Sequence, residues 1–291
     1  MSKRLSLLLL IVIVSVSTTY SQRMQRNNIV LWGSGGYSTF IGNADKLTSV
    51  GNIGAEIGIG YELSINKFIV QTGVGYRYSK ASLQLQDSLH NLMLVDSEGD
   101  IFRGYFEFSK NNDTYQMGHI IIPLLAGMKF DKFYFLAGGK VGINISTTST
   151  HSSNIRSYAD YAQFINVFEN MPNHGLLTWK EKNSYSLKFT PNYMASVELG
   201  YLFKSKPSKK LSMSYRIAAF ADYGINKIKT TSGVDQDLIL SKSPTVYQPY
   251  LNSILLSQDH KNAVFNPLFV GIKFTAVFGL SNSHKCMCED Y

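Results

Sequence analysis

Long apolar runs are scarce in this sequence of 291 residues. The most apolar stretch, residues 5–16, is shorter than the about 20 residues that a membrane-spanning helix needs. No other stretch approaches the length and hydrophobicity of such a helix. Any insertion of the chain into a membrane must therefore depend on strands, which satisfy their backbone hydrogen bonds only when they close into a barrel.

Cysteine is equally scarce, with two residues in the whole sequence. Cys286 and Cys288 lie one residue apart, where a disulfide is geometrically awkward. Together with His284 and Asp290 they offer four side chains for a metal ion, but such a short run rarely forms an isolated site. We predict no metal and no cofactor. A disulfide or partner linkage at Cys286 and Cys288 and an ordinary tail are the alternatives that stay open.

Recognisable catalytic spacing is also absent. The histidines fall in predicted loops or at the start of a strand, without the spacing of a zinc motif or a catalytic triad. His119, Ser146, His151 and Asp222 could meet at one rim of the fold, although a chain of this length supplies such sets by chance. The sequence therefore favours a protein that is not an enzyme.

A broad basic surface is missing as well. The net charge is +8, but the excess is concentrated in residues 204–210, which carry four lysines: Lys204, Lys206, Lys209 and Lys210. Nucleic-acid binding requires a basic face with exposed aromatic residues. We therefore predict no nucleic-acid partner.

The first residues have the features of an export signal. Lys3 and Arg4 precede the apolar residues 5–16, and small residues lead to a cleavage boundary after Ser21. We predict a removable signal peptide, residues 1–21. No cysteine near this boundary could accept a lipid, which argues against a lipoprotein.

Alternation of side chains identifies the strands. In residues 53–63, apolar residues alternate with glycine and glutamate, which is the period of a strand with two different faces. Five further segments show the same split: residues 70–79, 133–146, 193–203, 213–226 and 268–278. Residues 29–40 and 119–130 are expected to be strands with a weaker pattern, and Pro123 predicts a bulge or local irregularity in the second.

Connections between these strands alternate in length. Short turns are expected at residues 64–67, 131–132 and 204–210, and longer connections after residues 40, 83, 146 and 226. Short turns at one rim and long loops at the other are the layout of bacterial outer-membrane barrels, and the 18 Tyr and 17 Phe suit their aromatic girdles.

We therefore predict an all-β fold, an eight-stranded antiparallel transmembrane β-barrel with short periplasmic turns and long extracellular loops. It covers residues 22–280, and residues 281–291 form a C-terminal periplasmic tail. Within the loops, residues 101–109 are expected to extend the barrel as part of a hairpin. Residues 157–171 and 247–256 are each expected to form a short surface helix.

The polar faces of the strands carry glycine and isolated charges, which suit the narrow interior of an eight-stranded barrel. Because a buried charge without a partner is costly, we predict an ion-pair network with a structural role in the lumen. A gated narrow pore lined by the same residues is the alternative. The residues are Glu56, Glu62, Arg77, Lys129, Lys140, Glu198, Arg216, Asp222 and Lys273.

One segment resembles a known family. Residues 119–125, His-Ile-Ile-Ile-Pro-Leu-Leu, are similar to the aliphatic-Pro-Leu-Leu strand of the Bacteroidetes-type outer-membrane β-barrel domain family, often called PorT-like. The segment with Gly271, Lys273 and Phe274 resembles the closing strand of that family. The resemblance implies an outer-membrane barrel without catalytic residues and a link to protein secretion or envelope assembly. The chain departs from the usual ending, because Phe278 is followed by further residues.

Together these features predict an integral protein in the outer membrane of a Gram-negative bacterium, acting as a non-enzymatic scaffold or surface-binding protein through its extracellular loops. The expected partners are outer-membrane lipid and lipopolysaccharide, the barrel assembly machinery, and an unknown protein or surface ligand at the loops. The alternatives are a narrow channel for small solutes and an outer-membrane lipid-modifying enzyme or protease.

Overall fold

The computed structural model describes residues 25–43, 46–95, 99–162, 178–204, 212–228, 239–241, 249–256 and 264–280. The predicted signal peptide, residues 1–21, and the predicted tail with Cys286 and Cys288 lie outside these ranges. Within these ranges, no helix has the length and hydropathy needed to cross a membrane.

The described residues are almost entirely strand. Their elements are β1 (Gln25–Asn43), β2 (Leu47–Ile65), β3 (Phe68–Leu85), β4 (Ser88–Val95), β5 (Ile101–Phe130), β6 (Phe133–Asp160), β7 (Thr178–Leu187), β8 (Asn192–Lys204), β9 (Ser212–Gly224), β10 (Ile239–Ser241), β11 (Pro249–Leu251), the 3-10 helix η1 (Ile254–Leu256) and β12 (Val264–Leu280). The predicted all-β class is confirmed.

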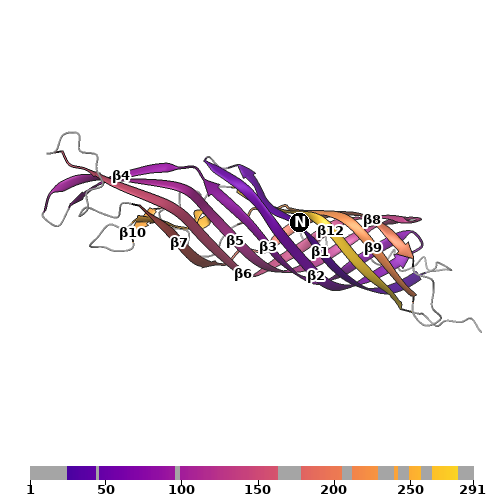
Figure 1. Cartoon of the computed structure of the whole chain (residues 1–291). Helices are drawn as coiled ribbons and strands as arrows, with labels where there is room; N and C mark the ends of the chain where they lie inside the picture. Colours follow the sequence, from indigo (N-terminus) through magenta and orange to yellow (C-terminus); the bar gives the residue numbers. More distant parts are fainter. Residues whose placement is uncertain are drawn as a thin grey trace, which may run out of the picture.

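Eight of these strands close a ring by antiparallel pairing (Figure 1). The order around the ring is β1, β2, β3, β5, β6, β8, β9 and β12, and β12 pairs back to β1. The strand count of the described chain nevertheless exceeds the predicted eight. The additional strands β4, β7, β10 and β11 lie where loops were expected.

Tight turns join ring strands at one end, here called the turn end. β2 connects to β3 through Asn66 and Lys67, and β5 connects to β6 through Asp131 and Lys132. Asn66 and Asp131 have positive φ angles of 55° and 52°, a conformation that Asn and Asp tolerate better than most residues. The third predicted turn, residues 204–210, lies outside the described residues except for Lys204.

At the opposite, distal end, two strands continue far beyond the ring. β5 has 30 residues and β6 has 28, and β4 and β7 pair with their outer edges. We call β4, β7, residues 101–117 of β5 and residues 147–160 of β6 the extension; Figure 1 shows it projecting from the barrel. The predicted strand over residues 101–109 is part of it.

Three expectations about the distal connections are wrong. β1 reaches Asn43 and β2 begins at Leu47, so the first long connection is short. The helix predicted for residues 157–171 is wrong in its described part, because β6 continues to Asp160. Residues 249–256 form β11 and the three-residue helix η1 instead of a surface helix.

Bulges near the distal end explain why the sequence pattern stops there. On β6, Asn144 pairs with His119 and Ser146 with Gly118, so Ile145 is an extra residue. An extra residue moves the following side chains to the opposite face. Lys140 is therefore buried before the bulge and Thr147 after it, although their positions have opposite parity. β2 has an equivalent irregularity between Gly51 and Gly54.

Pro123 produces a local irregularity without a bulge. The ladder between β3 and β5 lacks the pairs between Thr72–Leu124 and Gly75–Ile121, but the register is the same on both sides. Thr72 Oγ1 donates a hydrogen bond to the Pro123 carbonyl at 3.0 Å. A side chain thus replaces part of the ladder that proline cannot join.

The sequence analysis predicted a polar interior, but apolar clusters fill part of the barrel. Near the turn end lies an apolar cluster formed by Ile69, Leu125, Tyr134, Leu136 and Ala218. A larger apolar cluster closes the distal end; its members include Phe40, Leu83, Tyr115, Met117, Leu187, Ile254, Leu256 and Phe265. The charged residues share the lumen with the turn-end cluster, where Arg216 lies over the ring of Tyr134, and continue toward the distal cluster.

A close approach of β1 and β12 yields a testable prediction. Gly36 pairs with Gly271, and a Cβ on Gly271 would lie 2.1 Å from the Gly35 carbonyl oxygen. A Cβ on Gly33 would meet nothing within 4 Å. We expect Gly271→Ala to lower the free energy of unfolding by about 1–3 kcal/mol through overpacking. Gly33→Ala should have little effect. Urea denaturation in detergent micelles, followed by circular dichroism, would contradict this if both variants behaved alike.

Candidate functional site

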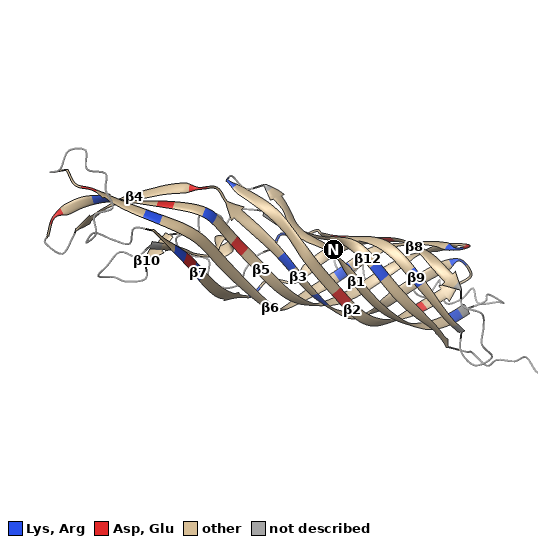
Figure 2. Ribbon diagram, viewed as in Figure 1, with Lys and Arg blue, Asp and Glu red and all other residues tan. Residues whose placement is uncertain are grey.

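The nine predicted lumen charges all lie on ring strands, and Figure 2 shows acidic and basic positions along the barrel as well as on the extension. Eight of the nine residues are at most 5% exposed, and the Lys129 side chain is 23% exposed. The structure brings them together in three groups along the lumen. Each group contains both signs of charge.

Glu62 is the centre of the group nearest the turn end. Arg216 binds both carboxylate oxygens of Glu62, with Nη1–Oε2 and Nη2–Oε1 distances of 2.5 and 2.7 Å. Lys129 Nζ lies 3.3 Å from Oε1, and Ser64 Oγ and Asn28 Nδ2 donate to the same oxygen at 2.9 and 3.1 Å. This forked pairing suits Arg, whose planar guanidinium matches a carboxylate.

Glu198 is the centre of the middle group. Lys273 Nζ lies 2.8 Å from its Oε2, and the Tyr134 hydroxyl donates to its Oε1 at 2.5 Å. Both carboxylate oxygens therefore have a donor. The partners come from β6, which is the ladder neighbour of β8, and from β12, which β9 separates from β8, so this group joins strands that are not all neighbours in the ring.

Arg77 connects two carboxylates in the distal group. Its Nε and Nη2 donate to Glu56 Oε2 at 2.8 and 2.5 Å, and Nη2 also pairs with Asp222. Lys140 Nζ lies 2.9 Å from Asp222 Oδ2, and Ser196 Oγ donates to Asp222 Oδ1 at 2.6 Å. Two cations and two anions thus share one buried network.

Aromatic rings support the buried cations, a feature that the sequence analysis missed. Each ring lies 4.6–5.5 Å from the cation above it, close enough for cation–π attraction. The pairs are Arg77 with Phe269, Lys140 with Phe220, Arg216 with Tyr134 and Lys273 with Trp32. The sequence signal that could have revealed these contacts is the presence of aromatic residues on the polar, inward face of the ring strands.

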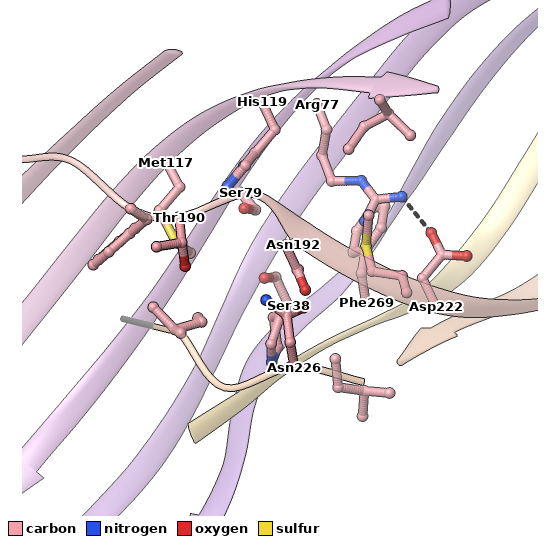
Figure 3. A pocket seen from close by; sticks show the side chains of 16 residues that line it. Ser38, Arg77, Ser79, Met117, His119, Thr190, Asn192, Asp222, Asn226 and Phe269 are labelled. Carbon is pink, nitrogen blue, oxygen red and sulfur yellow. Dashed lines mark hydrogen bonds and ion pairs between the residues drawn. The ribbon is translucent and has the colours of Figure 1, made fainter. Parts of the chain in front are cut away.

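A small cavity lies above the distal group (Figure 3). Arg77 and Asp222 form part of its lining, together with His119, Ser79 and Asn192. Its volume is about 30 Å³, close to the share of liquid volume that one water occupies. The space therefore suits water and is too small for a larger solute.

The four residues considered for catalysis do not form a set. His119 and Asp222 line the same cavity, but the oxygens of Asp222 are occupied by Arg77, Lys140 and Ser196. Ser146 is exposed on the outer surface, and His151 lies in the extension. Among the described residues, no group of His, Cys, Asp and Glu is placed to hold a metal ion.

A second polar centre lies inside the extension. Asp113 is fully buried and accepts hydrogen bonds from Tyr115 Oη at 2.5 Å, Ser253 Oγ at 2.8 Å and the Ile254 amide at 2.8 Å. Ser149 Oγ donates to its other oxygen. Residues 249–256, here called the strap, are attached through these bonds to the inner face of β5 and β6.

Apolar contacts complete the attachment of the strap. Ile254 and Leu256 belong to the cluster that closes the distal end of the barrel, together with Phe40 and Phe265. Leu251 packs in a separate cluster with Phe108, Phe106 and Ile155 of the extension. The sequence analysis missed this arrangement because the residues fall in segments expected to be loops.

No family model matches the chain, and no curated protein matches it. The chain is similar to two solved structures of Ail, the attachment invasion locus protein of Yersinia pestis, one of them in complex with the heparin analogue sucrose octasulfate. The identities are 11% and 9%, and each similarity covers 87% of this chain and 99% of the other, with a TM-score of 0.25. The PorT-like resemblance stays a prediction.

The Glu62–Arg216 pair yields a stability prediction. Glu62→Gln removes the charge that compensates buried Arg216, and we expect a loss of about 3–5 kcal/mol in the free energy of unfolding. Glu107→Gln is the matched control, because its pair with Arg156 is exposed and 4.0 Å long. Exposed pairs contribute about 0–1 kcal/mol. Equal urea midpoints for the two variants in detergent micelles would rule out a stabilising role for the lumen pair.

Proposed function

We propose that this protein is an integral outer-membrane β-barrel of a Gram-negative bacterium, with a closed lumen and no enzymatic activity, that displays the extension as a surface-binding platform. The observation that carries the proposal is the inversion of polarity across the barrel wall. Ion pairs lie inside, and large apolar side chains cover the outside of every ring strand.

The outer apolar side chains form a continuous belt. One member from each ring strand is 43–68% exposed: Leu31, Ile57, Val74, Leu124, Phe135, Leu199, Ile217 and Ile272. Contact of such a surface with water costs about 25 cal/mol per Å² of apolar area. An apolar area that surrounds a protein marks contact with a membrane.

Aromatic residues border the belt at both ends. Near the turn end, the exposed aromatics are Tyr61, Phe68, Phe130, Phe133 and Phe203. Near the distal end, they are Tyr37, Tyr76, Tyr78, Tyr193 and Tyr223. Aromatic girdles of this kind mark the two interfaces of a transmembrane barrel. They support a membrane position between the tight turns and the extension.

Beyond the distal girdle the outward faces of β6 and β7 are polar, whereas β4 exposes Leu89 and Met93. Thr148 and Ser186 are exposed there, as are Lys180 and Lys182 on β7. On β6 we therefore assign residues 133–145 to the membrane and residues 147–160 to the outside. Tight turns would face the periplasm, as in other outer-membrane barrels.

The extension offers a surface for binding. A groove of about 720 Å³ crosses β4, β5, β6 and β7, within the range of about 300–1,000 Å³ that ligand sites occupy. Its lining combines apolar Leu89 with Glu107, Asn154, Arg156 and Lys180. This mixture favours recognition of a surface component over a catalytic role. A part in secretion or envelope assembly rests on the family resemblance alone.

The orientation can be tested with an epitope tag. A tag inserted between β4 and β5 should bind antibody on intact cells, because that connection belongs to the extension. The same tag between β8 and β9 should bind antibody only after the outer membrane is permeabilised. The reverse pattern would show that the barrel is inverted.

The closed lumen predicts an absence of conductance. The ion-pair layers and the strap occupy the path through the barrel, so the full-length protein should give no steady openings in planar lipid bilayers. Openings of one defined size would instead support the narrow-channel alternative. An empty-detergent preparation is the control for leakage of the bilayer itself.

A further inference from the structure

We propose that Asp113 and His151 form a pH-sensitive latch, which holds the strap in the distal end of the barrel at neutral pH and releases it in acid. The inference depends on contacts inside the extension and goes beyond the proposed surface binding. It concerns groups outside the membrane-spanning residues.

Asp113 makes the polar attachment of the strap. Ser253 Oγ and the Ile254 amide both donate to Asp113 Oδ2 at 2.8 Å. The Tyr115 hydroxyl, which donates to Asp113, also accepts a bond from the Leu255 amide at 3.3 Å. The carboxylate thus holds three consecutive strap residues, directly or through Tyr115. Loss of its acceptor capacity would free the polar side of the strap.

His151 is placed to compete for this carboxylate. It is the direct partner of Asp113 in the β5–β6 ladder, and its side chain is fully buried on the same inner face. Neither Nδ1 nor Nε2 has a hydrogen-bond partner. A neutral imidazole has one donor and one acceptor, and leaving both unpaired in a buried site is costly. The closed strap therefore encloses an unsatisfied histidine beside an anion.

Burial is the main cause of a lowered His151 pKa, and the negative charge of Asp113 opposes that shift only in part. The other titratable groups around the latch are Tyr115 from β5, Glu181 and Tyr185 from β7 and Tyr250 from the strap. Burial raises the pKa values of Tyr115 and Tyr185 above their usual range, so both stay protonated as the pH falls. At pH values above those at which carboxylates ordinarily become protonated, His151 is then the group whose protonation would change the latch.

The sign of the effect follows from linkage. With the strap closed, the His151 pKa is below its ordinary value of about 6.5; with the strap released, water reaches the ring and the pKa returns toward that value. The open state therefore binds more protons, and closure is favoured above about pH 6.5 and weakened as the pH falls below it. A protonated imidazole can also donate to Asp113 and displace the strap donors.

Release would change the surface that the extension presents. Ile254 and Leu256 would leave their contacts with Phe40 and Phe265, and apolar side chains at the distal end would become accessible. Acidification would thus convert a sealed end into an apolar surface. Histidines commonly act as switches in this pH range because small changes in their surroundings move their pKa across it.

Thiol labelling of the full chain in lipid vesicles tests the proposal. Ile254→Cys, in a background with Cys286→Ser and Cys288→Ser, places a thiol at a fully buried strap position. Ser186→Cys provides an exposed thiol on β7 that corrects for the pH dependence of the maleimide reagent. The labelling rate of Ile254→Cys divided by that of Ser186→Cys should rise several-fold when the pH falls from about 7.5 to about 5.5, two values on either side of the ordinary histidine pKa.

Two further variants identify the group that titrates. In the Ile254→Cys background, His151→Gln should remove the pH response, whereas His90→Gln, on β4 of the same extension, should retain it. A constant ratio in the parent protein, or an unchanged response after His151→Gln, would overturn the proposal.

Asp113→Asn keeps the test decisive if His151→Gln fails to fold. Because it weakens the acceptor for the strap, Asp113→Asn should label rapidly at both pH values. Persistence of the full pH response in this variant would contradict the latch. Hydrogen exchange at residues 249–256 in the unaltered chain gives an independent measure and should accelerate in acid.

Discussion

Pairing of buried charge is the constraint on which the barrel depends. Eight strands leave an interior that side chains must fill, and this chain fills its centre with carboxylates, cations and aromatic rings. Glu62, Glu198 and Asp222 each bind donors from more than one strand, so the network connects parts of the wall that are not neighbours in the ladder. The same groups that allow charges to be buried therefore also fix the shape of the lumen.

Polarity then divides the molecule along its length. The apolar belt and its aromatic borders occupy the part of the barrel whose interior holds the ion pairs. Beyond the bulge at Ile145, the outer face becomes polar and the inner face carries the strap and its attachment to Asp113. One extra residue in β6 thus coincides with the change from an apolar outer wall to a sheet whose outer face on β6 is polar and whose inner face is covered by the strap.

Much of the ring could be predicted from the sequence, because alternation with period two survives wherever the outer face is apolar and the lumen face carries glycine and charged residues. The nine charges named from this alternation all lie on ring strands. The prediction failed in the extension, in residues 101–117 of β5 and 147–160 of β6. Bulges there change which face alternate residues occupy, and both faces carry polar residues. Asp113, His151 and Ser253 were missed as a group because their proximity arises from pairing between segments far apart in the sequence. The aromatic partners of the cations were missed because aromatics were assigned only to the outer surface.

The seam between β1 and β12 has a consequence for the order of folding. These two strands come from opposite ends of the described chain and pair along almost their whole lengths. Until β12 has been delivered, β1 and β9 present open edges whose backbone groups can pair with other chains. Closure of the ring is therefore a late event between residues far apart in the sequence, and it is expected to be slow. Until β12 pairs with β1 and β9, the open edges of those two strands must be protected, which this sequence requires as much as it requires a stable finished barrel.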